Sequence, residues 1–154
     1  MLEAKRGVLG LMVMAAFAVC APAALAQTTI TQDTPISSTV PSQCNDHTIA
    51  FTGTLHSVFT FNTNPNGMTH TNFDFSVHAT GVDTTTAINY VVNESIHNES
   101  NVHGIAQVQN FGTKMMLISQ GSAPNEVDRS TLHVVINSDN TFVVQRNSET
   151  ISCK

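Results

Sequence analysis

The chain has 154 residues, of which 41% are hydrophobic and only 11% are charged, and its formal net charge is −5. This length is enough for one domain with a core of its own. A charged fraction far below the roughly 25% of typical globular domains, together with the acidic balance, excludes the usual profile of a nucleic-acid-binding protein. Eight Phe, one Tyr and no Trp favour β-structure over long helices.

The first 26 residues have the three parts of a secretory signal peptide. Lys5 and Arg6 supply the positive charge, an apolar run follows at 8–19, and residues 24–26 have the Ala-Leu-Ala pattern of a cleavage site. A membrane anchor needs about 20 apolar residues, which is more than this run provides. We therefore predict a secreted or periplasmic protein with no membrane span once the signal is removed.

The cysteines support the same compartment. Cys20 lies within the predicted signal peptide, and Val19 before it is larger than the small residue that lipoprotein signals carry. Cys44 and Cys153 remain, one near each end of the rest of the chain. In an oxidising compartment they most simply form one disulfide, and two free thiols are the alternative.

The predicted domain begins after a polar segment. Residues 27–43 are rich in Thr, Ser, Gln and Pro and contain few large apolar side chains. Such a composition does not bury enough apolar surface to offset the entropy lost on ordering. We therefore predict a flexible leader over 27–43 and a single β domain over 44–154.

The first part of this domain predicts a hairpin. Over 48–62, odd positions carry most of the large apolar side chains and even positions carry mainly Thr, which indicates a long half-buried strand. Gly53 within it predicts a bend or a bulge. The Asn-Pro-Asn-Gly sequence at 64–67 predicts a turn, and a second strand follows with Phe73 and Phe75 on its apolar face.

The rest of the domain predicts further short strands, with turns at 98–101 and 110–112 and a loop at 120–125. About eight strands and no helical periodicity are typical of an antiparallel meander, either a small closed, calycin-like barrel or a β-sandwich. A disulfide between the start of the first strand and the end of the eighth favours the barrel, because it would join the seam. The further strands are predicted at 88–96, 102–109, 114–119, 131–137, 141–147 and 148–153.

One face of these strands supplies the candidate site. An eight-stranded barrel has room for side chains or for one small ligand, so the same residues are candidates for lumen lining or for core filling. The position of Glu94 distinguishes a binding protein from a small enzyme, which is a further alternative. If its carboxyl points into a closed lumen, a small cyclase- or isomerase-type enzyme is favoured, whereas a position at the rim disfavours one. The candidate lumen residues are Phe51, Leu55, Phe59, Phe73, Phe75, Tyr90 and Glu94.

No established catalytic or metal-binding pattern is present in the sequence. The seven His residues form neither a His-x-His nor a His-Glu-x-x-His pattern, so we expect solvated or hydrogen-bonded histidines, no metal and no cofactor. There is no Gly-x-Ser-x-Gly elbow, and most acidic residues are predicted in turns or on polar faces. We expect no catalytic residue, but non-catalytic binding of a small apolar molecule or a role in surface interactions.

Several short motifs resemble those of a family of small secreted bacterial proteins of unknown function. The resemblance covers most of 44–154, but 92–112 matches poorly, and Asp-Thr-Thr-Thr at 83–86 stands where the family has a Gly-richer loop. It implies export, one domain with a cysteine near each end, and no assigned catalytic residue. The matching segments are Cys44-Asn45, 49–59, Asn66-Gly67, Gly81-Val82, Tyr90, Gln120-Gly121, 131–134 with Asn137, and Cys153-Lys154.

Overall fold

The computed structural model describes residues 27–154, so the predicted signal peptide lies outside the described residues. Seven β-strands follow one another in this part of the chain. Among residues 27–154 there is no helix long and apolar enough to cross a membrane. The strands are β1 (Thr28–Pro41), β2 (Thr48–Thr63), β3 (Thr69–Asp83), β4 (Asn89–His103), β5 (Ala106–Ser119), β6 (Glu126–Ile136) and β7 (Phe142–Cys153).

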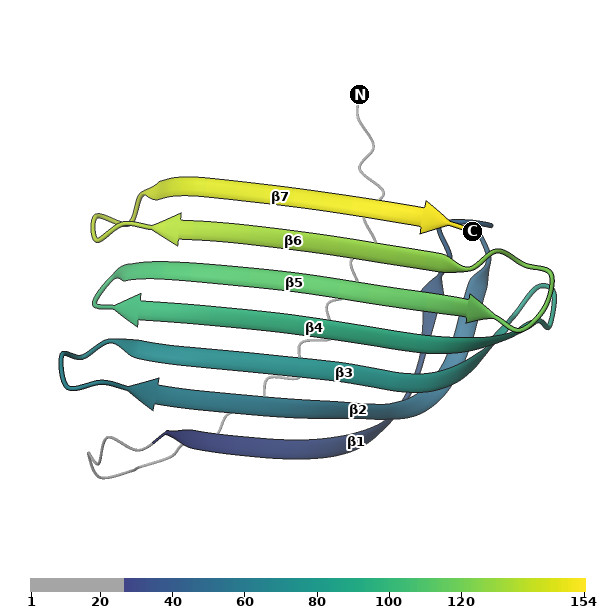
Figure 1. Ribbon diagram of the computed structural model, residues 1–154, viewed down its shortest axis with the longest axis horizontal. Helices are drawn as coiled ribbons and strands as arrows, with labels where there is room; N and C mark the ends of the chain where they lie inside the picture. Colours follow the sequence, from purple (N-terminus) through teal and green to yellow (C-terminus); the bar gives the residue numbers. More distant parts are fainter. Residues whose placement is uncertain (1–26) are drawn as a thin grey trace.

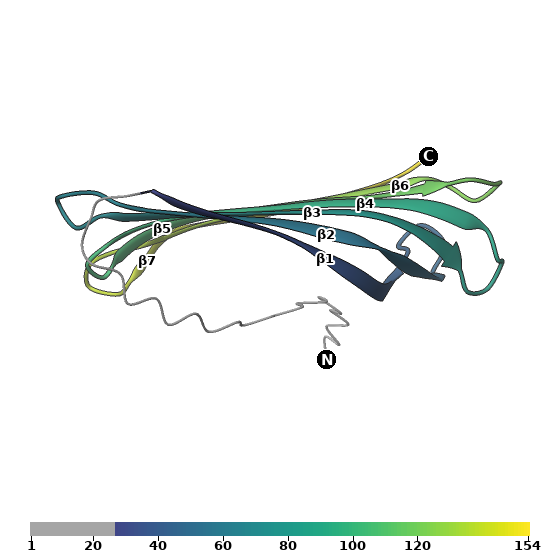
Figure 2. The ribbon, with the colours of Figure 1, turned by 90° about the horizontal axis from the view of Figure 1, so that it is seen from below.

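All seven strands belong to a single antiparallel sheet, in which each strand pairs with the next one in the chain (Figure 1). The predicted all-β meander is therefore confirmed. The sheet is not closed into a barrel, because β1 and β7 are its two edges and do not pair with each other. No second sheet forms a sandwich within residues 27–154 either, and Figure 2 shows one twisted layer from its edge.

The segment predicted as a flexible leader forms β1 instead. Its residues pair with β2 without interruption, from Thr28 opposite Phe61 to Pro41 opposite Thr48. Thr, Ile and Val suit an extended backbone, and the neighbouring strand supplies hydrogen-bond partners that offset the cost of ordering the segment. The β domain of the structure therefore includes this segment as well as 44–154.

The strands are also longer and fewer than predicted. β4 continues through 98–101, where the sequence predicts a turn, and β5 continues through 110–112. Side-chain hydrogen bonds also link β4 and β5 in this region. Gln107 Nε2 donates to Ser100 Oγ over 3.1 Å, and Gln109 Nε2 donates to Asn98 Oδ1 over 3.3 Å. The two strands predicted at 141–147 and 148–153 are one strand, β7.

Side chains alternate between two faces of the sheet. We call the face with the buried core the inner face and the opposite one the outer face. At one end of the sheet, β1 and β2 bend over the inner face toward the far edge (Figure 1, right). This bend lets the core include residues from strands that are not neighbours. The core residues are Ile49, Val77, Ala79, Tyr90, Val92 and Leu117.

The bend brings the loop between β1 and β2 to the end of β7. Cys44 in this loop forms a disulfide with Cys153, and their Cα atoms are 5.7 Å apart. The predicted bridge is therefore present, although it joins a bent corner to an edge rather than closing a barrel seam. Cys44 precedes β2 and Cys153 ends β7. Because the chain crosses the sheet an even number of times from β2 to β7, both cysteines lie at the same end of the sheet.

Gly53 of β2 lies in close contact with β3. A Cβ atom added there would lie 2.2 Å from the backbone oxygen of His78 and 2.5 Å from Cβ of Ala79. The pairing of β2 with both neighbours is continuous through this position. Gly53 therefore does not form a bulge, and the close approach of β3 leaves no room for a side chain at this position.

Replacing Gly53 with Ala is expected to lower the free energy of unfolding by about 1–3 kcal/mol or more, the usual cost of overpacking. Gly112→Ala in β5 is the matched control, because the nearest atom to its added Cβ is 4.0 Å away. Equilibrium urea denaturation of both variants measures the difference. Equal losses at the two positions would contradict the close packing of Gly53 against β3.

Candidate functional site

Strand register arranges the inner-face side chains in rows across the sheet, because directly paired residues share a face. Successive rows are two residues apart along each strand, or roughly 6.6 Å. The aromatic row consists of Ile30, Phe59, Phe73, Asn98, Phe111, Leu132 and Asn147. The middle row consists of Gln32, Ser57, Phe75, Ile96, Thr113, Ser130 and Glu149. The acidic row consists of Thr34, Leu55, Val77, Glu94, Met115, Asp128 and Ile151.

All seven candidate residues lie on the inner face, but they do not line a closed lumen because the sheet is open. Tyr90 belongs to the buried core, and Phe51 and Leu55 pack against it. Phe59, Phe73 and Phe75 lie farther along the strands and are half-buried, as is Glu94. The candidates therefore divide between the core under the bent corner and the uncovered part of the face. The uncovered set is Phe59, Phe73, Phe75 and Glu94.

The uncovered part holds an aromatic cluster that consists of Phe59, Phe61, Phe73 and Phe75. Phe59 lies edge-to-face against both Phe73 and Phe75, with ring centroids 5.4 Å apart in each pair. Phe61 packs against Phe73 in the same manner at 5.7 Å and is 38% exposed. Edge-to-face packing stabilises the cluster, yet its rings retain surface that a ligand can cover.

Five carboxylates also lie on the inner face, and the sequence-based interpretation missed most of them. It placed Asp83 and Glu126 in turns or on polar faces, whereas both are only 1% exposed. The period-two pattern of β6 was the available signal, because Glu126 and Asp128 alternate in step with the apolar Leu132 on the same face. The inner-face carboxylates are Asp83, Glu94, Glu126, Asp128 and Glu149.

Two of these carboxyls, Glu94 and Asp128, have a raised pKa. Burial raises the pKa of Glu94, and the negative charge of Asp128 raises it further. Burial likewise raises the pKa of Asp128, with added repulsion from Glu149 and Glu126, while a backbone hydrogen bond at Arg129 acts in the opposite direction. The acidic part of the inner face therefore has unfavourable interactions when its carboxylates are all charged.

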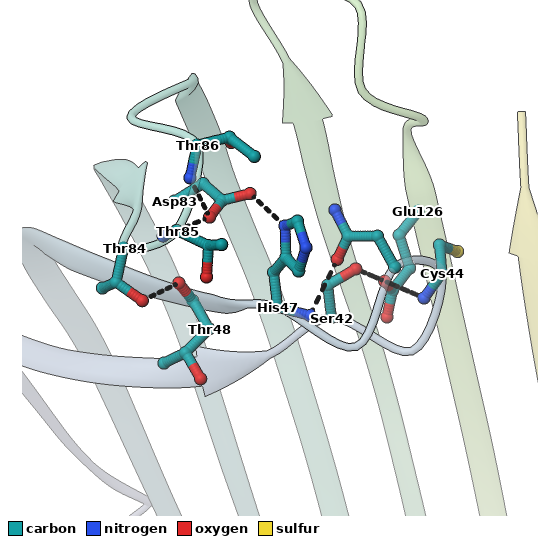
Figure 3. A network of polar contacts seen from close by, with 10 residues as sticks. Ser42, Cys44, His47, Thr48, Asp83, Thr84, Thr85, Thr86 and Glu126 are labelled. Atoms are coloured by element: carbon teal, nitrogen blue, oxygen red, sulfur yellow. Dashed lines mark hydrogen bonds and ion pairs between the residues drawn. The ribbon is translucent and has the colours of Figure 1, made fainter.

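Glu126 fastens the bent corner to β6 (Figure 3). Its Oε2 accepts hydrogen bonds from Ser42 Oγ at 2.7 Å, from the backbone N–H of Gln43 at 2.9 Å and from that of Cys44 at 3.3 Å. These contacts satisfy the loop backbone beside the disulfide. One carboxylate oxygen of Glu126 therefore has a structural role, while Oε1 has no partner among the described residues.

Asp83 fastens the same corner to the loop after β3 (Figure 3). Its Oδ2 lies 2.7 Å from His47 Nδ1, and its Oδ1 accepts hydrogen bonds from the backbone N–H groups of Thr85 and Thr86 at 2.7 and 3.0 Å. Burial alone would raise the pKa of Asp83, but these hydrogen bonds outweigh burial and hold the pKa well below its usual range.

The depressed pKa of Asp83 predicts an acid-dependent contribution to stability. The contribution is fully present above the unfolded-state pKa, about 3.9, and is lost as the pH falls through the folded-state value. Asp83→Asn should therefore lower stability at neutral pH and flatten its decline below about pH 5. Denaturation midpoints measured from pH 2 to 7 test this. Asp46→Asn, an exposed change in the neighbouring loop, is the control and should keep the wild-type slope.

The outer face carries an array of paired histidines. Asp33 and Asp74 lie within hydrogen-bond distance of His56 and His97, each on an adjacent strand. Three more histidines pair in the same way with Asn side chains. Among residues 27–154, no group of three or more His, Cys, Asp or Glu side chains could hold a metal ion. The Asn-paired histidines are His70, His78 and His133.

A hollow of about 570 Å³ is lined by residues of β1 to β4 and by Gln120. Most of its surface is apolar, from residues such as Phe51 and Tyr90, and Thr52, Thr80 and Asn89 supply polar groups. Its lining contains no charged residue. The hollow therefore differs from the inner face, where carboxylates and the aromatic cluster lie on the same surface.

Comparison of the chain with protein-family models, curated proteins and solved structures finds no match.

Proposed function

We propose that this chain is an exported binding protein that holds an apolar small molecule on the inner face of its sheet. The observation that supports this most directly is the aromatic cluster on a face without a second layer among residues 27–154. Soluble proteins use contiguous exposed apolar surface mainly for binding. The rest of the aromatic row extends this surface toward Phe111 and Leu132.

The proposed role is non-catalytic. Glu94 lies on an open sheet face beside the core and is only half-buried, rather than inside a closed lumen. A general acid or base acts best when it is held against the reacting group of a bound substrate. The open position of Glu94 therefore favours binding over the cyclase or isomerase alternative.

A small molecule fits the inner face better than a second copy of the chain does. Two inner faces placed against each other would bring together the carboxylates Glu94, Asp128 and Glu149 of both copies. Like charges placed opposite each other at an interface cost several kcal/mol. The Cys44–Cys153 disulfide supports the proposed export, since such bonds persist mainly in oxidising compartments.

Titration with decanol, followed by isothermal calorimetry, tests the proposal. Decanol should bind, and Phe73→Ala should weaken binding by about tenfold or more, because it removes aromatic surface that the ligand would cover. Val58→Ala, on the outer face of β2, is the matched control and should leave binding unchanged. Absence of decanol binding, or equal loss in both variants, would refute the proposal.

A further inference from the structure

Charge is divided unequally between the two faces of the sheet. Lys114, Arg129 and Arg146 all lie on the outer face, as do the six histidines within the strands. Among residues 27–154, the inner face of the strands carries five carboxylates and no basic side chain. Asp83 pairs with His47 of the bent corner. The other four carboxylates have no basic side chain beside them on this face of the described strands.

Unpaired polar atoms lie within this acidic region. Asp128 Oδ1 and Glu126 Oε1 are buried and have no hydrogen-bond partner among the described residues, and Glu126 is only 1% exposed. A buried carboxylate oxygen without a partner costs free energy, so most such atoms in folded proteins are paired. A hydrogen-bond donor that reached either atom would remove this cost there.

The acidic and aromatic rows have a spacing that one elongated molecule can span. Glu94 and Asp128 are in the same row on β4 and β6, with Met115 of β5 between them, so their backbones are about 10 Å apart. The aromatic row is four residues away along the strands, or roughly 13 Å. Phe75 and Ile96 of the middle row supply apolar surface between the two.

We infer that the ligand of the inner face is a cationic amphiphile, with an apolar body over the aromatic cluster and a protonated amine between Glu94 and Asp128. This inference rests on the proposed function and adds the chemical class of the ligand. An ammonium group donates hydrogen bonds and has no acceptor, which matches a site made of carboxylate oxygens.

The acidity of the site supports the same ligand class. Burial and mutual repulsion raise the pKa of both Glu94 and Asp128. A cation placed between them would favour their charged forms and relieve the repulsion. A ligand with a carboxylate would instead add a negative charge beside Glu94 and Asp128, where Glu126 and Glu149 already repel Asp128.

Calorimetric titration with decylamine, decanol and decanoate at pH 7, below micelle-forming concentrations, tests the inference on the full-length mature chain. Decylamine should bind about tenfold or more tightly than decanol, since hydrogen bonds to charged groups contribute more than neutral ones. Decanoate should bind more weakly than decanol. The double variant Glu94→Gln/Asp128→Asn should reduce decylamine affinity to the level at which the wild-type protein binds decanol.

The control removes the same number of negative charges from the outer face. Asp74→Asn/Glu99→Gln removes two outer-face carboxylates and should preserve the preference for decylamine. If decylamine and decanol bind equally to the wild-type protein, the inference is refuted while the proposed function stands. If none of the three ligands binds, the proposed function fails as well. A preference that persists in the inner-face variant would also overturn the inference.

Discussion

Removal of the Cys44–Cys153 disulfide is expected to lower the free energy of unfolding by about 4–5 kcal/mol. The cysteines are 109 positions apart, and the chain-entropy treatment assigns such a long loop a stabilisation of this size. The bond also holds the bent corner over the core, so its loss should increase exposure of Ile49 and Leu117. Urea denaturation of the oxidised protein and of Cys44→Ser/Cys153→Ser measures the effect.

Reduction of the wild-type protein is the control for the serine substitutions. The reduced protein and the double variant should have the same midpoint, because both lack the cross-link and retain small polar side chains. A double variant as stable as the oxidised protein would show that Glu126 and Asp83 hold the corner without the disulfide. Two freely alkylatable thiols in the folded, exported protein would contradict the bridge itself.

Leu117→Ala is expected to cost about 2–5 kcal/mol, the range for truncating a fully buried Leu. Leu117 is 0% exposed and lies between Val92 and Glu126 in its row, directly under the bent corner. Ile118→Ala is the matched control, because the adjacent residue points to the outer face and is only half-buried. It should cost less than half as much, since the transfer contribution follows the apolar area removed from water.

Phe59→Ala extends this comparison to the proposed binding face. Phe59 is half-buried, so without ligand its truncation should cost less than the 3–5 kcal/mol or so typical of a buried Phe. The same urea series measures it. A loss as large as that at Leu117 would indicate that the aromatic cluster is covered in solution, and equal losses at Leu117 and Ile118 would contradict the assignment of the inner face.

Strand-forming segments and face assignment were predictable from the sequence, but strand ends and closure were not. The period-two pattern places Phe51, Phe59 and Phe73 on one face, as the register of β2 and β3 confirms. The polar composition of 28–41 gives no indication of a strand, because this segment becomes ordered by pairing with β2. Strand continuity through 98–101 depends on backbone pairing with β3 and β5, which no local pattern reveals.

The candidate site was predictable only in its apolar half. The Phe positions follow from alternation along single strands, which the sequence displays directly. The acidic half requires Glu94 of β4 and Asp128 of β6 to share a row, and this depends on the pairing of both strands with β5. The disulfide was predicted from cysteine count and position, whereas the corner that it fastens depends on the bend of β1 and β2 over the inner face.

The strictly sequential pairing of the strands has a consequence for the order of folding. Each neighbouring pair needs only a short connection, so hairpins can form one after another along the chain with little loop-closure entropy. The corner instead joins the β1–β2 loop to the end of β7, and closing such a distant contact costs more entropy than closing any single hairpin. Closure of the corner should therefore follow assembly of the sheet. Formation of the disulfide then requires that the last strand has joined the sheet, so the oxidised bond marks chains in which the corner has closed.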